Sequence, residues 1–372
     1  MKTINYQFKV LIAFAMIFVV CGHVGCDAFS LNGIFNYDSF HMPLFLFISG
    51  YFFKYKDDKT IKQKIFKCCK RLLFPLMAWN LVYGGLLTYM RHHGPFYFSM
   101  GDDLSLYTFF YRSLTMGDAF QFNIASWFIM TLFIVKCFNY LLRYCINKSM
   151  IQFSEKGYLC LFFLLVILGI LLGKSDIVFD FKVLLVRVLY SSLWFELGIF
   201  YNMCLEKYDT ISNHRYFIIL LSIQALLLCI THGKNESIVY AGIFPFSVFT
   251  TLLFAFNGIA FWLRISRLLT PILKESNSFM YLANHTFSVM MHQGFFIKMF
   301  NGVFYIIFLH STRFQDFDPI KFQNEIWYIY LPHRLAIFNN LDVIVGIVMP
   351  LVLVYFLEYT ENCLKKIIKC AL

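Results

Sequence analysis

Long apolar runs separated by short polar segments dominate this chain. A helix that crosses a bilayer needs roughly 20 mostly apolar residues, and ten runs approach that length. They lie near 8–26, 39–54, 72–90, 124–145, 157–173, 183–203, 215–231, 238–263, 279–308 and 342–364. A further stretch at 104–120 is interrupted by Arg112 and Asp118, which favours an interfacial or re-entrant segment. The pattern predicts an all-α integral membrane protein with a bundle of about ten transmembrane helices.

Composition and charge agree with that prediction. Hydrophobic residues make up 59% of the chain and charged residues only 14%, whereas soluble domains are about a quarter charged. With a cytoplasmic N-terminus, the cytoplasmic segments carry 21 Lys and Arg residues and the outer segments carry eight. The positive-inside rule therefore favours ten spans with both termini cytoplasmic. The net charge of +11 follows from this bias and from contact with membrane lipids, so no nucleic-acid partner is expected.

No soluble domain interrupts the runs, and we expect one membrane domain over residues 1–372. The 11 cysteines are scattered, without a CxxC pair or the spacing of a metal site. No metal cofactor is therefore expected. The first run lacks a cleavage site for a signal peptidase and is interpreted as a retained span.

Two histidines face the outer side of the predicted bundle. His23 ends the first run, and His41 begins the second, just before Pro43. An ionisable side chain within a membrane segment indicates a functional site, and imidazole is suited to proton transfer near neutral pH. Asp27 would share a face with His23 on a continuing helix and orient its ring. The alternatives are a histidine that hydrogen-bonds within the bundle, an interfacial His41 and an ordinary loop aspartate.

Other polar or aromatic side chains mark the later runs. Trp127 lies near the outer end of the fourth run, and Lys136 is nine residues deeper on roughly the opposite face. Glu196 is an acid deep inside a run, so it needs a partner from another span. His292 shares a helical face with His285. Each has a structural alternative: a belt tryptophan, a snorkelling lysine, a polar lock or a packing histidine.

Several stretches resemble, in order along the chain, the acyltransferase 3 family of integral membrane O-acyltransferases, especially its fucose 4-O-acetylase-like branch. They are VVCGH at 19–23, SFHMPLFLFISGYFF at 39–53, KRLLFPLMAW at 70–79, SWFIMTLFIVK at 126–136, WFELGIFY at 194–201 and NHTFSVMMHQGFF at 284–296. The sequence departs from the family at Ile12, where Arg or Lys often stands eleven positions before the first-span histidine. The nearest base here is Lys9.

The resemblance implies a single acyltransferase domain in the inner (plasma) membrane. Such an enzyme moves an acetyl group from acetyl-CoA to a hydroxyl of a cell-surface polysaccharide or its lipid-linked precursor. It further implies that His23 is the catalytic base, aided by Asp27 and His41. Basic residues on or toward the cytosolic side would bind the donor, and polar or aromatic residues of the later runs would bind the acceptor. The donor set is Lys70, Arg71 and Lys136, and the acceptor set is Trp127, Glu196 and His292.

Two other functions remain open from the residues alone. A secondary transporter or exporter of an envelope precursor would also place isolated His and Glu residues at mid-membrane depth. A glycan polymerase or ligase would act on lipid-linked sugars and ignore acetyl-CoA. Its expected large outer loop is only weakly approached by residues 309–341.

Overall fold

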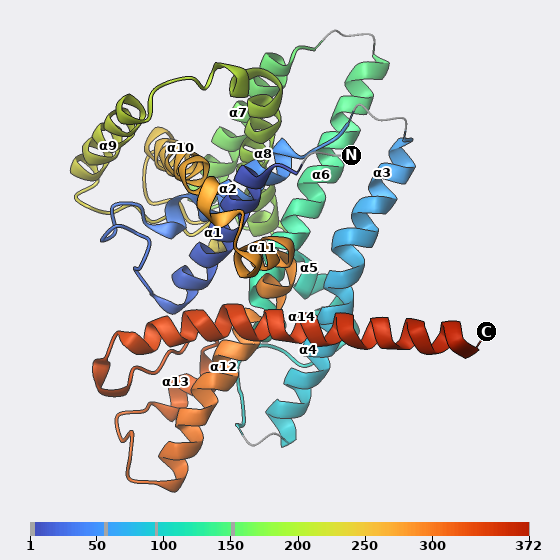
Figure 1. Ribbon diagram of the computed structural model, residues 1–372, viewed down its shortest axis with the longest axis vertical. Helices are drawn as coiled ribbons and strands as arrows, with labels where there is room; N and C mark the ends of the chain where they lie inside the picture. The colour runs from blue at the N-terminus through green and yellow to red at the C-terminus, as the bar shows by residue number, and fades with distance from the viewer. Residues whose placement is uncertain (1–3, 56–58, 94–95, 150–152, 372) are drawn as a thin grey trace.

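The computed structural model describes residues 4–55, 59–93, 96–149 and 153–371, and these form a bundle of helices (Figure 1). The helices are α1 (Tyr6–Val24), α2 (Tyr37–Tyr51), α3 (Ile61–Cys68), α4 (Phe74–His93), α5 (Ser113–Thr115), α6 (Trp127–Lys148), α7 (Glu155–Lys174), α8 (Lys182–Phe200), α9 (Asn213–Ile230), α10 (Val248–Leu273), α11 (Asn277–Asn284), α12 (Thr286–His310), α13 (Pro319–Asn324) and α14 (Ile337–Ala371). A π-helical turn, Cys69–Leu73, joins α3 to α4, and a 3-10 segment, Gln121–Ser126, leads into α6. The predicted all-α membrane fold is confirmed.

Among the described residues, eight helical segments are long and apolar enough to cross a bilayer. They contain α1, α4, α6, α7, α8, α9, α10 and α14. The runs at 39–54 and 279–308 are also helical, but α2 has only 15 residues and α12 carries polar side chains such as Gln293 and Lys298. The count of ten spans and the cytoplasmic termini stay predictions. Figure 1 shows α14 lying across the direction of α4 and α6.

Two predicted segments differ in detail from the structure. The run at 238–263 begins as a short 3-10 turn, and the long helix α10 starts only at Val248. Gly242 adopts a left-handed conformation with φ of 69°, and Pro245 follows it, so a helix cannot continue through this point. Within the stretch at 104–120, residues 106–115 are helical and include the π-helical turn Thr108–Arg112 and α5. This is too short to cross a bilayer, and its interfacial or re-entrant placement stays a prediction.

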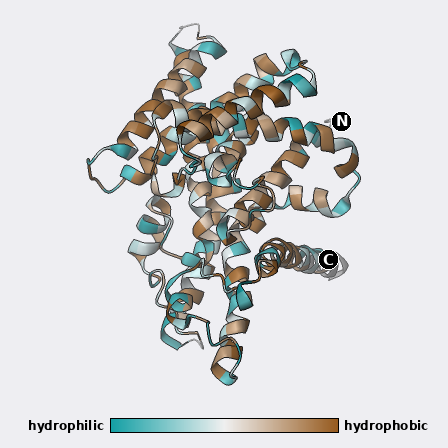
Figure 2. Cartoon of the chain, turned by 90° about the vertical axis from the view of Figure 1, so that its left-hand side faces the viewer, coloured by the Kyte–Doolittle hydropathy of each residue, from teal (hydrophilic) through white to brown (hydrophobic). Residues whose placement is uncertain are grey.

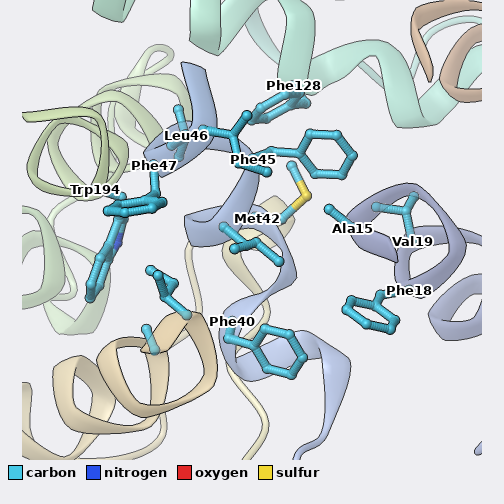
Figure 3. Close-up of a cluster of buried hydrophobic side chains, with 14 of the residues drawn as sticks. Ala15, Phe18, Val19, Phe40, Met42, Phe45, Leu46, Phe47, Phe128 and Trp194 are labelled. Atoms are coloured by element: carbon cyan, nitrogen blue, oxygen red, sulfur yellow. The ribbon is translucent and has the colours of Figure 1, made fainter. Parts of the chain in front are cut away.

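The centre of the bundle is built from α1, α2, α8 and α10. In the apolar windows of α1 and α8, 67% of the residues are buried, against 17% in α9. Figure 3 shows Phe18 of α1, Phe40 of α2 and Trp194 of α8 among the side chains of this core. Figure 2 shows hydrophobic colour along the helices and hydrophilic colour mainly at loops and helix ends. The outer helices α7 and α9 therefore present apolar side chains to lipid.

The backbones of α2 and α8 are in direct contact. A Cβ atom on Gly50 would lie 1.8 Å from the carbonyl oxygen of Phe195, and one on Gly198 would lie 2.0 Å from that of Phe47. Small residues allow such close approach between membrane helices, where dispersion forces replace the hydrophobic effect. This contact fixes α2, which carries His41, against the centre of the bundle.

A second apolar cluster forms a separate lobe, here called the aromatic lobe. It combines the end of α4, residues 96–100 and 119–122, the second half of α12, α13 and residues 314–330, in the lower part of Figure 1. Phe317, Phe322 and Tyr330 are buried at its centre. The aromatic lobe places the segment 324–327 next to the C-terminal end of α1 and the N-terminal end of α2.

A polar cluster, here called the polar lock, ties α6, α7 and α8 together. Arg143 lies 2.5 Å from Glu196 and 3.0 Å from Glu155. Asn139 donates to Glu196 at 3.2 Å and accepts from Arg143 at 2.8 Å. Tyr55 and Tyr158 hold their rings 4.3 Å and 4.0 Å from the guanidinium. Arg143 and Glu196 are closed off from solvent, whereas the side chain of Glu155 is 17% exposed.

We expect alanine at the touching glycines to destabilise the bundle. Gly50→Ala or Gly198→Ala places a methyl group on a backbone carbonyl, which costs about 1–3 kcal/mol. Gly85→Ala is the matched control, because its Cβ meets nothing within 4 Å and alanine favours helix. Thermal unfolding in detergent measures the difference. Equal midpoints for Gly50→Ala and Gly85→Ala would contradict the close contact.

Removal of the buried acid from the polar lock should also destabilise the protein. Glu196→Gln leaves Arg143, whose side chain is 3% exposed, with half of its charge partners, so we expect a loss of about 3 kcal/mol. Glu361→Gln removes the exposed partner of Lys365 and should cause no measurable change. The same unfolding assay compares them, and equal stability of both variants would show that the polar lock adds nothing.

Candidate active site

A cavity of about 660 Å³ opens between the ends of α1 and α2, the start of α6, and α12. Loop residues 100–101, 237–240 and 324–327 complete its lining. Three predicted site residues, His23, His41 and Trp127, meet there. Its volume lies within the usual range for small-molecule sites.

His23 occupies the last turn of α1, which ends because Gly25 adopts a left-handed conformation with φ of 67°. The imidazole stacks on Trp327, with ring centroids 4.1 Å apart and planes inclined by 20°. Its Nδ1 is buried without a hydrogen bond of ordinary geometry. The side chain of Gln293, itself fully buried, lies close to the imidazole. The stack on Trp327 thus fixes the plane of the His23 ring, and the ring lines the cavity.

His41 lies in the first turns of α2, which starts at Asn36, whose side chain accepts from the backbone N–H of Asp38 at 3.0 Å. Nδ1 of His41 pairs with the carbonyl of Tyr37 and lies 4.0 Å from a carboxylate oxygen of Asp38. Asp38 also lines the cavity. The acid beside His41, in the cavity that His23 also lines, is therefore Asp38.

The expected pairing of Asp27 with His23 is wrong. It assumed that the first helix continues, but α1 ends at Val24 and the chain turns at Gly25. Asp27 instead accepts hydrogen bonds from the hydroxyl of Ser30, at its backbone carbonyl (3.1 Å) and its side chain (3.4 Å). It does not line the cavity.

Basic side chains behind the lining hold its loops by their backbone carbonyls. Arg91 donates to the carbonyl of Gly101, and Arg187 donates to that of Tyr240 at 2.7 Å. Lys298 donates to the carbonyl of Glu325 at 2.5 Å. We call Arg91, Arg187 and Lys298 the pinning cations. Each fixes a loop that contributes to the cavity.

Aromatic rings form much of the cavity wall. Trp127 lines it as predicted, with the guanidinium of Arg187 4.9 Å from its ring on the buried side. Tyr240 stands beside it, 5.9 Å between ring centroids. Burial raises the pKa of the Tyr240 phenol, so this hydroxyl remains a neutral hydrogen-bonding group. Trp327, from the aromatic lobe, completes the wall.

Two residues expected to bind the acceptor lie elsewhere. Glu196 belongs to the polar lock, paired with Arg143 from another helix, as its depth required. His292 is buried against α4, where its Nδ1 lies 2.7 Å from the hydroxyl of Tyr83 and its ring meets Trp79 edge to face. Neither lines the cavity, and an acceptor-binding role for either stays a prediction.

The residues expected to bind the donor lie away from the cavity. Lys70 and Arg71 are exposed in the π-helical turn between α3 and α4. Lys136 is half-buried on α6, two and a half turns, or about 13 Å, from Trp127 along the axis. Ile12 packs against the apolar core, and Lys9 donates to the side-chain oxygen of Asn284.

Sequence reasoning missed Asp38, Gln293 and Trp327. Asp38 follows a polar loop and looks like a surface residue until it is seen one turn before His41. Trp327 comes from a loop far along the chain, which no local pattern connects to His23. Gln293 carried a usable signal, because an amide within an apolar run must find a polar neighbour.

Comparison with known protein families identifies the family of this chain. A family model described as an acyltransferase domain matches residues 5–359. Neither the curated proteins nor the solved structures include a significant match. The matched residues include every helix that lines the cavity, together with nearly all of the bundle. The chain is a multi-pass membrane acyltransferase and belongs to the acyltransferase 3 family.

Proposed function

We propose that the protein moves an acetyl group from acetyl-CoA to a hydroxyl of a cell-surface polysaccharide or its lipid-linked precursor, in the plasma membrane. The observation that carries this proposal is the setting of His23. One face of its ring stacks on Trp327, and the side chain of Gln293 lies close to the ring. The ring also lines a cavity large enough for a sugar.

His23 supplies the base that an acyl transfer to a hydroxyl requires. If the side-chain oxygen of Gln293 accepts Nδ1–H, the lone pair stays on Nε2, where it can take the proton of the acceptor hydroxyl. The hydroxyl oxygen then forms the ester bond as the bond to the thiol sulfur breaks. His23 returns the proton to the departing sulfur, so atoms and charge balance. The stack on Trp327 keeps the ring from turning away.

His41 and Asp38 support this chemistry from the neighbouring helix. Asp38 lies within 4.0 Å of His41, and both line the cavity with His23. A carboxylate close to the pair stabilises positive charge that develops on an imidazole during transfer. His41 also offers a second nitrogen for hydrogen bonds to the acceptor.

The donor is proposed to approach from the opposite side of the bundle. Lys70 and Arg71 present exposed positive charge, which suits the phosphates of coenzyme A. Lys136 lies between them and the cavity along α6. The acids Asp38 and Glu325 in the lining disfavour the anionic nucleotide there. Only the uncharged pantetheine arm and its acetyl group would need to reach His23.

Loss of the base should abolish transfer while the fold persists. We expect His23→Ala in liposomes to release thiol from acetyl-CoA at least about 10²-fold more slowly, the lower range for a general base. His310→Ala, at the exposed end of α12, is the matched control and should keep its rate. Thiol release and label transfer from labelled acetyl-CoA to added glycans measure both. Wild-type rates in His23→Ala would overturn the proposal, and flux without thiol release would favour an exporter.

Gln293 should act through His23 and not through the fold alone. We expect Gln293→Leu to lower kcat about tenfold or more with little change in KM, because the imidazole loses the partner that selects its tautomer. Gln293→Glu keeps an acceptor oxygen and should retain more activity than the leucine variant. Equal activity of the two variants would contradict a positioning role.

A further inference from the structure

The lining of the cavity has an acidic and hydrogen-bond-accepting character. Its charged side chains, among the residues that the structure describes, are Asp38 and Glu325, with the imidazoles of His23 and His41. No described Lys or Arg belongs to the lining, although the chain has a net charge of +11. Exposure of both acids leaves their oxygens able to accept hydrogen bonds from a ligand.

The pinning cations do not compensate for this acidity as ligand-binding groups. Arg187 and Lys298 are 3% and 0% exposed, and each donates two of its N–H groups to backbone carbonyls. Arg91 donates to a carbonyl and also lies 3.4 Å from Asp103. Recognition of a carboxylate or phosphate requires free, correctly aimed donors. The pinning cations lie behind the lining and aim these donors at backbone carbonyls of the protein.

The remaining wall suits a ring with an apolar face and a polar edge. Trp127, Tyr240 and Trp327 provide broad aromatic surfaces, and Gln121 and Asn324 add amides that both donate and accept. Carboxylates strengthen hydrogen bonds from hydroxyl groups because the acceptor is charged. A polyhydroxylated ring without its own charge satisfies all of these groups, whereas an acidic ring would bring its charge against Asp38 and Glu325.

We infer that the acylated residue of the acceptor is a neutral sugar, held by hydrogen bonds from its hydroxyls to Asp38 and Glu325, and that these carboxylates exclude sugars that carry a carboxylate or phosphate. This inference rests on the proposed function, because it names the acceptor of that reaction. The selectivity for neutral sugars would arise both from hydrogen bonds to the two carboxylates and from repulsion of acidic sugars by the same carboxylates.

Matched sugar pairs test this selectivity. Glycosides of glucose, galactose and mannose are compared with the corresponding 6-carboxylate sugars, in which a carboxylate replaces the hydroxymethyl group at C6 and the rest of the ring is unchanged. We expect wild-type protein to prefer at least one neutral sugar over its acidic partner by about tenfold or more, since like charges brought close together cost several kcal/mol at most and less near water. Transfer from labelled acetyl-CoA gives the ratio of kcat/KM within each pair.

Variants locate the source of that ratio. Glu325→Gln and Asp38→Asn keep the size of the side chain but remove its charge, so each should bring the neutral-to-acidic ratio about 3- to 30-fold closer to one. Asp176→Asn is the control, because Asp176 is exposed and does not line the cavity; it should leave the ratio unchanged. The measured quantity is the ratio of kcat/KM for the neutral and acidic sugars. The absolute rate is not used, because Asp38 also contacts His41 and its substitution can slow transfer to both sugars.

A binding measurement separates this inference from the proposed function. Quenching of tryptophan fluorescence by each sugar reports occupancy beside Trp127 and Trp327 without any transfer. If no sugar is acylated, the proposed function fails, and the ratio of dissociation constants still decides the inference. Equal binding or transfer within the pairs, no binding of any neutral sugar, or ratios that Glu325→Gln and Asp38→Asn leave unchanged would overturn it.

Discussion

Polar side chains inside this bundle must find their partners within the protein, because neither lipid nor bulk water can supply them. Arg143 meets this constraint with two glutamates, an asparagine and two aromatic rings. Arg187 and Lys298 meet it with backbone carbonyls. The first arrangement joins three helices, and the second fixes loops that would otherwise be free at the bundle surface. Buried charge thus positions the elements from which the cavity is made.

The same constraint explains why the setting of His23 is unusual. Its Nδ1 and the amide of Gln293 are both buried without an ordinary hydrogen bond, although the two side chains lie close together. Packing against Trp327 holds His23 in one orientation, so little reorganisation is needed when it acts as a base. The contact between α2 and α8 at Gly50 and Gly198 adds to this, since it leaves the neighbouring His41 little freedom to move.

The sequence predicts the parts of this structure that depend on local pattern. Apolar runs mark every long helix, and His23, His41 and Trp127, each near the end of its run, line one cavity. Prediction fails where one residue redirects the chain, as Gly25 does before Asp27 and Gly242 does before α10. It also fails where partners come from distant loops, as Trp327 does. For Glu196 the need for a partner from another helix was foreseeable, but its identity, Arg143, depends on how α6 and α8 pack.

Charge separates the two ends of α6 in a way that matches two different substrates. Trp127 begins this helix among aromatic and acidic groups, whereas Lys136 lies deeper, toward the exposed Lys70 and Arg71. A polyanionic donor and an uncharged acceptor would therefore be sorted to opposite ends before they meet at His23. Selectivity would then arise from where the chain places its few buried charges as much as from the shape of the cavity.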